Sequence, residues 1–178
     1  MADYYSDLGR DNREATDSTL AEKPKFITKN GRIVYGGGGI TPDIFSELEL
    51  DFSESSREIL SHPDRLTFKY AGELKEKIQS TYEDFESFTR NYKMKEKGKK
   101  QFYEWLIWQE IEFSKGELDE NWAYLENRIL SEVASRIWGK EYLFRKLLDE
   151  DTQVQEAMLH FGEAHKLIHE YSQFPAGE

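Results

Sequence analysis

From about residue 53 onward, apolar residues recur at every third or fourth position, which is the spacing of an amphipathic helix. The clearest stripe lies between Asp119 and Trp138, and Gly139 is a natural helix stop after it. The members of this stripe are Trp122, Leu125, Ile129, Val133 and Ile137. Because each such stripe has to be buried against another, the pattern predicts a helical bundle.

The neighbouring segments carry the same pattern over different lengths. We expect Ser53 to cap a short helix that ends at His62-Pro63, and Asp64 to cap the next helix. The stripe of that next helix consists of Leu66, Tyr70, Leu74 and Ile78. Further helices are predicted over residues 81–92, 101–113, 119–138, 140–148 and 152–171, the last of them capped by Asp151 or Thr152.

Before these helices the pattern changes to two short runs of β-forming residues. Phe26–Thr28 and Ile33–Tyr35 flank Asn30-Gly31, and this dipeptide is a strong hairpin signal because both residues accept positive φ. The expected fold class is therefore mainly α, a helical bundle with a short N-terminal β-hairpin or extended segment. We place the first region at residues 1–52 and the bundle at residues 53–178.

The charge of the chain changes the range of partners to be considered. With 35 acidic against 24 basic residues the formal net charge is -11, so we expect no nucleic-acid partner, because binding nucleic acid requires a basic face. The densest basic stretch, between Lys93 and Lys100, is predicted to be a solvated turn between helices rather than a contact patch. The absence of cysteine excludes disulfides, thiol catalysis and cysteine-type zinc sites.

No segment is apolar for long enough to span a bilayer, and Met1–Arg10 lacks the apolar stretch of a signal peptide. The composition leaves two interpretations open, a cytoplasmic chain or a fragment without its own export signal.

Neither a metal nor a cofactor is expected. His165 and His169 have a spacing that can bind zinc, but no third ligand accompanies them, and a solvated helix face is the preferred interpretation. All four tryptophans fall on helical stripes and are expected in the core; an exposed one would instead mark a partner surface.

The stretch from the hairpin to residue 44 is the most informative part of the chain. Four glycines and then Ile-Thr-Pro-Asp-Ile follow the second run of β-forming residues, and they contain no Gly-Lys-Ser/Thr of a phosphate-binding loop. One interpretation is a hairpin with a Gly-rich edge. The residues that define the motif are Asn30, Gly31, Arg32, Gly36, Gly37, Gly38, Gly39, Ile40, Pro42 and Asp43.

In order and spacing, this motif resembles the segment that closes the protease core in the carboxyl-terminal processing (tail-specific) serine proteases. Residues 4–8 resemble a stretch that some bacterial members carry just before it. The helical remainder resembles the C-terminal extension of the Bacteroidetes-type members, with Ile137-Trp138-Gly139 and residues 151–155 as the matching phrases.

The resemblance implies an enzyme whose Ser-Lys dyad and PDZ module lie upstream of the motif. No serine and lysine of this chain match that dyad, so no catalytic residue is assigned and we expect no peptidase activity from the chain alone. The parent protein would be a serine endopeptidase of the periplasm or cell envelope. The chain would be its non-catalytic C-terminal region, which braces the protease core, self-associates or contacts a protein substrate or adaptor.

The alternative hypothesis is a stand-alone helical protein–protein interaction module in which the motif has arisen by chance. It predicts that Met1 is a native start and that the first fifty or so residues fold stably. The two hypotheses therefore differ in whether the first fifty or so residues fold stably in the isolated chain.

Overall fold

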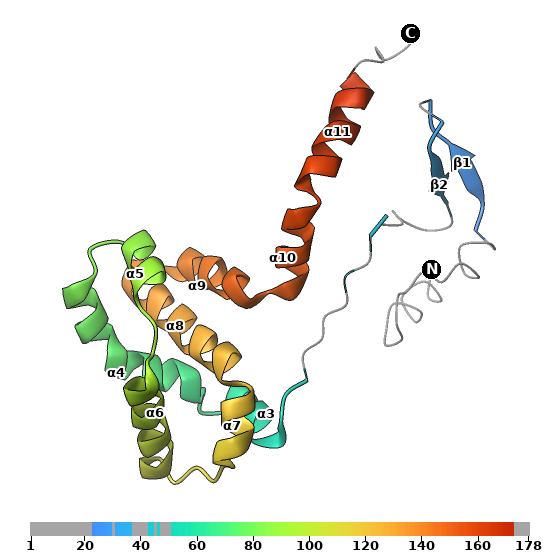
Figure 1. The fold of residues 1–178 in the computed structure, drawn as a ribbon. Coiled ribbons are helices and arrows are strands. Elements are labelled where there is room, and N and C mark those ends of the chain that lie inside the picture. The colour runs from blue at the N-terminus through green and yellow to red at the C-terminus, as the bar shows by residue number, and fades with distance from the viewer. Residues whose placement is uncertain (1–22, 30, 37–42, 45, 47–50, 173–178) are drawn as a thin grey trace. The chain divides into compact units, whose positions relative to one another are not determined.

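A computed structural model describes residues 23–29, 31–36, 43–44, 46 and 51–172 of the chain (Figure 1). Residues between Leu48 and Met158 form one unit, and the two ends of the chain belong to another. The described residues are mainly helical, with one short antiparallel hairpin near the N-terminus, so the predicted fold class is confirmed.

The hairpin consists of β1 (Lys25–Ile27) and β2 (Ile33–Tyr35). Phe26 lies opposite Val34 in the register. The turn contains Gly31 at φ +78°, a conformation that glycine adopts without steric cost. The predicted hairpin is therefore confirmed, although Asn30 lies outside the described residues.

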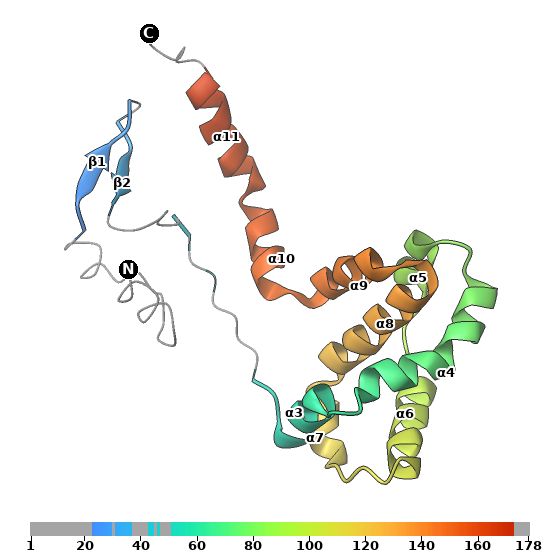
Figure 2. The ribbon, with the colours of Figure 1, turned by 180° about the vertical axis from the view of Figure 1, so that it is seen from behind.

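The helices are α3 (Glu54–Ser61), α4 (Leu66–Thr81), α5 (Phe85–Asn91), α6 (Glu96–Trp108), α7 (Lys115–Glu120), α8 (Trp122–Trp138), α9 (Lys140–Leu147), α10 (Thr152–Leu159) and α11 (Phe161–Ser172), with a 3-10 turn, η1 (Leu148–Glu150), after α9. Within the helical unit, α8 packs against both α4 and α9 (Figures 1 and 2). Its predicted stripe is confirmed, with Leu125, Ile129 and Val133 completely buried.

The core around α8 is strongly aromatic. Its largest fully buried side chains include Ile59, Leu66, Ile78, Phe88, Phe102, Leu106 and Leu118. The ring of Tyr70 lies 4.8 Å from that of Phe102, and burial raises the pKa of the Tyr70 hydroxyl to about 12. Aromatic pairs at such distances add to the stabilisation from buried area.

Three predicted helix starts are wrong. Arg65, and not Asp64, precedes α4, in a left-handed conformation with φ 52°; the Asp64 carboxylate instead accepts a hydrogen bond from Lys69 at 2.8 Å. That hydrogen bond lowers the pKa of Asp64. The helix predicted from residue 81 begins at Phe85, because the Asp84 side chain accepts a hydrogen bond from the Ser87 N–H at 2.7 Å.

The helix predicted from residue 101 begins at Glu96, so the second half of the lysine-rich stretch is helical rather than a turn. A Cβ at Gly98 would lie 3.3 Å from the Cβ of buried Met94, so glycine allows this first turn to pack closely on Met94. The ammonium group of Lys99 forms an ion pair with Asp119 at 2.9 Å and lies over the Trp122 ring. One positive charge of the stretch is therefore paired within the helical unit.

Two predicted helices are each divided. The segment predicted from Asp119 to Trp138 contains the end of α7 and all of α8, with Asn121 between them. The segment predicted over residues 152–171 is divided at His160 into α10 and α11, next to Gly162, which lowers helix propensity by about 1 kcal/mol relative to alanine. The Asp151 side chain accepts a hydrogen bond from the Val154 N–H at 3.0 Å, so the predicted cap at Asp151 is confirmed.

Candidate functional site

The hairpin motif is the first candidate, and the structure describes part of it. Gly31 forms the turn, and Arg32 forms an ion pair with Asp43. The motif's two charged residues, eleven positions apart in the sequence, are thus brought together. The remaining predicted motif residues, apart from Gly36, lie outside the described residues: Asn30, Gly37, Gly38, Gly39, Ile40 and Pro42.

Gly36 has a packing role at the end of β2. Its N–H donates to the Pro24 carbonyl at 2.8 Å, which extends the pairing of the strands by one hydrogen bond. A Cβ at this position would lie only 2.5 Å from the Cε2 atom of Phe26. Glycine therefore allows the Phe26 ring to lie against the backbone of the motif.

Both faces of the hairpin expose apolar side chains. Phe26 and Val34 are opposite each other and thus share one face, while Ile27 and Ile33 share the other. Phe26 is 58% exposed, Ile27 75% and Ile33 53%. A sheet with one solvated face would alternate apolar and polar residues, so a pair of apolar residues on each face indicates cover on both sides.

Serines at the start of the helical unit have structural roles. Ser53 caps α3 by accepting a hydrogen bond from the Ser56 N–H at 3.4 Å, and its hydroxyl donates to the Glu117 carbonyl at 3.0 Å. The Ser55 N–H donates to the Glu117 carboxylate at 2.8 Å, and this bond is the main cause of the lowered pKa of Glu117. The Ser55 hydroxyl in turn accepts from the Ser114 N–H at 2.9 Å. The network fastens α3 to α7.

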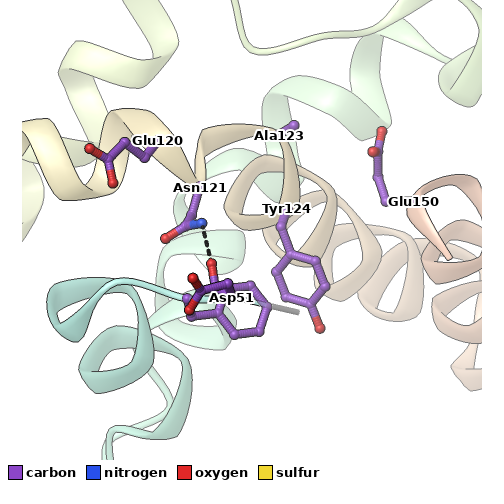
Figure 3. A pocket seen from close by; sticks show the side chains of 7 residues that line it. Asp51, Glu120, Asn121, Ala123, Tyr124 and Glu150 are labelled. Carbon is purple, nitrogen blue, oxygen red and sulfur yellow. Dashed lines mark hydrogen bonds between the residues drawn. The ribbon is translucent and has the colours of Figure 1, made fainter. Parts of the chain in front are cut away.

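A pocket lies beside this junction, where the chain enters the helical unit (Figure 3). It is lined by Asp51, Phe52, Glu120, Asn121, Ala123, Tyr124 and Glu150. The Asn121 side chain donates to the Asp51 carbonyl at 3.1 Å and accepts from the Ser53 N–H at 2.9 Å. The rings of Phe52 and Tyr124 lie 4.6 Å apart. Asn121 thus joins residues 51–53 to the start of α8, and the sequence gives no sign of this role.

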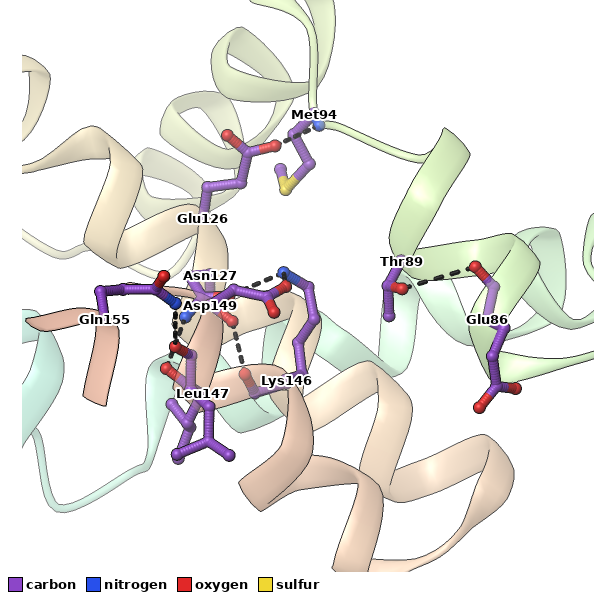
Figure 4. A network of polar contacts seen from close by, with 11 residues as sticks. Glu86, Thr89, Met94, Glu126, Asn127, Lys146, Leu147, Asp149 and Gln155 are labelled. Atoms are coloured by element: carbon purple, nitrogen blue, oxygen red, sulfur yellow. Dashed lines mark hydrogen bonds and ion pairs between the residues drawn. The ribbon is translucent and has the colours of Figure 1, made fainter. Parts of the chain in front are cut away.

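A second polar centre fastens α9 to α8 through a buried lysine (Figure 4). Lys146 is 8% exposed, and its Nζ donates to the Asn127 side chain at 2.8 Å and to the Asp149 carboxylate at 2.7 Å. The buried Ser131 hydroxyl donates to the Asn127 carbonyl at 2.7 Å. Sequence analysis missed this centre; the available signal was the pair of polar residues, Asn127 and Ser131, one turn apart beside the apolar stripe of α8.

Asp119 at the end of α7 connects to α6 through two donors. Its carboxylate accepts from Lys99 and from the Tyr103 hydroxyl, both at 2.9 Å. These bonds lower the pKa of Asp119 and raise that of Lys99. Burial is the main cause of the raised pKa of the Tyr103 hydroxyl. The arrangement keeps all three groups in their ordinary protonation states at neutral pH, as expected of a structural network.

The tryptophans divide into two classes. Trp105, Trp122 and Trp138 are half-buried and pack against the core, as predicted. Trp108, the last residue of α6, is 76% exposed, and its neighbour Ile107 is 66% exposed. The prediction that every tryptophan lies in the core is therefore wrong for Trp108, because the helix ends there and the following chain does not cover it.

The described residues contain neither a metal site nor a membrane-spanning helix. No group of three histidine or acidic residues in that part of the chain is placed to hold a metal ion, and the Nδ1 atom of His160 lies 3.5 Å from a Glu163 carboxylate oxygen. Within the same residues, none of the helices combines the length and the apolarity that crossing a bilayer requires.

One family model matches part of the chain. Residues 63–139 match a protein family described as a family of unknown function (DUF8443). This segment runs from the residue before Asp64 to Gly139 and thus includes α4 to α8, the centre of the helical unit. No curated protein and no solved structure matches the chain.

Proposed function

We propose that this chain is the non-catalytic C-terminal region of a carboxyl-terminal processing serine protease. In this proposal, the hairpin completes the protease core, and the helical unit braces that core or contacts a protein substrate, an adaptor or a second copy. The parent protein is a serine endopeptidase that acts in the periplasm or cell envelope. The resemblance of residues 26–44 supplies the family.

The hairpin carries the proposal. Each of its faces presents an exposed apolar pair, Phe26 with Val34 and Ile27 with Ile33. An isolated two-stranded hairpin is marginally stable in water. Because both faces of this hairpin carry apolar residues, we expect other protein layers to cover it on both sides. A place within the protease core would supply those layers. The ion pair between Arg32 and Asp43 joins the two charged residues of the motif.

Three serines at the start of the helical unit support the non-catalytic part of the proposal. Nucleophilic catalysis by a Ser-Lys dyad requires a desolvated lysine beside the serine. The Ser53 and Ser56 hydroxyls instead bond to each other and to the Glu117 carbonyl, and the Ser55 N–H donates to the Glu117 carboxylate. The buried Lys146 bonds to the Asn127 side chain and to the Asp149 carboxylate, and neither partner is a serine.

The decisive test is the reading frame upstream of Met1 together with hydrogen exchange. We expect that frame to encode a PDZ module and a Ser-Lys dyad. In the longer protein, the amides of Phe26 and Val34 should exchange at least tenfold more slowly than in this chain alone, because both faces become covered. As a control, the amides of Ile129 and Val133 in α8 should exchange alike in both proteins. An upstream frame without a protease core contradicts the proposal.

The exposed Trp108 favours the alternative, a stand-alone helical interaction module. That function predicts a native start at Met1 and hairpin amides that are protected in the chain by itself. Slow exchange of Phe26 and Val34 in the isolated chain would therefore favour the alternative.

A further inference from the structure

The C-terminal end of α6 presents two large apolar side chains on a fixed corner. Leu106 is completely buried, but Ile107 and Trp108 after it are 66% and 76% exposed. The chain reverses immediately: the Glu110 N–H donates to the Ile107 carbonyl and the Ile111 N–H to the Leu106 carbonyl, each at 3.0 Å. These bonds hold the corner, so presenting Ile107 and Trp108 costs little conformational entropy.

Carboxylates surround this apolar pair. Glu104 lies one helical turn before Trp108, and Glu110 and Glu112 follow within four residues; all three are exposed. Glu104 has one partner, Lys100, at 3.7 Å on the surface. Neither Glu110 nor Glu112 has a cationic partner among the residues that the structure describes. We call Glu104, Ile107, Trp108, Glu110 and Glu112 the α6–α7 corner.

The chemistry of the corner selects one class of occupant. Tryptophan is the best aromatic partner for a cation over its face, and unpaired carboxylates attract the same cation. Tryptophan is also one of the residue types that are enriched in binding hot spots. The same carboxylates repel nucleic acid and anionic lipid surfaces.

We propose that the α6–α7 corner docks a short segment of a partner protein in which apolar side chains alternate with arginine or lysine. The apolar side chain of the partner packs on Ile107 and Trp108. Its guanidinium or ammonium group lies over the Trp108 ring and pairs with Glu110 or Glu112. The corner lies within the helical unit, so the proposal holds whichever of the two functions above is correct.

The test uses the full chain and an acetylated probe peptide, Gly-Arg-Leu-Arg-Leu-Arg-Gly-amide, followed by nitrogen-15 NMR. We expect the indole N–H signal of Trp108 and the amides of residues 104–112 to shift on titration. Trp108→Ala should weaken binding about tenfold or more, as for other hot-spot tryptophans. Phe144→Ala is the matched control, since Phe144 is an aromatic residue, 57% exposed on α9, and its loss should leave the affinity unchanged.

Charge is tested separately with Glu110→Gln/Glu112→Gln. This variant should bind the probe several-fold more weakly and with a smaller dependence on salt, whereas Glu76→Gln on α4 should not. Peptides with glutamate in place of arginine, or serine in place of leucine, should bind poorly. Equal binding of the glutamate peptide, unchanged binding by Trp108→Ala, or no shift at millimolar probe would each overturn the proposal. Because the substituted side chains are exposed, unchanged melting confirms that each variant is folded.

Discussion

The helical unit and the hairpin differ in how far their aromatic residues are buried. Phe102 of α6 is completely buried among the rings of Tyr70, Trp105 and Trp122. Phe26 of β1 is 58% exposed and lies against Gly36. The first residue stabilises its own unit, while the second has apolar surface left for another layer. An apolar sequence alone therefore does not show whether a segment is stable by itself. That depends on whether other residues of the same chain bury its apolar side chains.

The polar contacts show the same difference. In the helical unit they join elements far apart in the sequence, as when Asn121 bonds to Asp51 and Ser53. In the hairpin they are local, as in the bond from the Arg32 N–H to the Thr28 hydroxyl at 3.1 Å. Long-range contacts make unfolding cooperative, so the helical unit should unfold as one transition in which the hairpin takes no part.

The largest expected effect is on the free energy of unfolding, when one phenylalanine in each region is replaced by alanine. Phe102→Ala should lower the free energy of unfolding of the helical unit by about 3–5 kcal/mol, because it leaves a cavity in a fully packed core. Phe26→Ala removes the same atoms from the hairpin and should change it by less than about 0.5 kcal/mol. Urea unfolding followed by circular dichroism at the helical signal measures both. A large loss from Phe26→Ala would show that the hairpin contributes to the stability of the helical unit.

A smaller loss is expected from the buried lysine of α9. Asn127→Ala removes one acceptor from the Lys146 ammonium group, which then keeps only Asp149, and should cost about 1–3 kcal/mol. The double variant Asn127→Leu/Lys146→Met removes both polar groups and should recover much of that loss. If the double variant is instead as unstable as the sum of its two single variants, Lys146 and Asn127 act independently.

The division into a helical region and a hairpin could largely be predicted from the sequence. The helical spacing around Leu125 and Ile129 and the Asn-Gly turn each depend on local periodicity and turn chemistry, and both are confirmed. Trp108 was misplaced, because a stripe of helical spacing does not show where the helix stops being covered. Lys146 and Asn121 were missed, because their partners are 19 and 68 residues away and only the fold brings them together.

The pH dependence of stability should sharpen the comparison further. The folded pKa values of Glu117 and Asp119 lie below their ordinary values of 4.5 and 3.8, so the unfolded chain binds more protons as the pH falls. Their contribution is therefore complete above about pH 5 and is lost as the pH falls through the lowered pKa values. Glu117→Gln should flatten the dependence of the urea midpoint between about pH 5 and pH 3, whereas Glu76→Gln should not. Equal slopes for both variants would exclude a role for the bond from Ser55 to Glu117.

The smallest effect is expected within the hairpin, from Gly36→Ala. The new Cβ would lie 2.5 Å from the far edge of the Phe26 ring, which is closer than van der Waals contact allows. Since that ring is more than half exposed, it can rotate away at little cost, and the unfolding of the helical unit should not change. The ring signals of Phe26 in the NMR spectrum should nevertheless move. Gly116→Ala in α7, where nothing lies within 4 Å of the added atom, is the control that should leave those signals in place. Unmoved Phe26 signals in Gly36→Ala would mean that the Phe26 ring does not lie against Gly36. The contact between the side chain of β1 and the glycine after β2 would then be absent in solution.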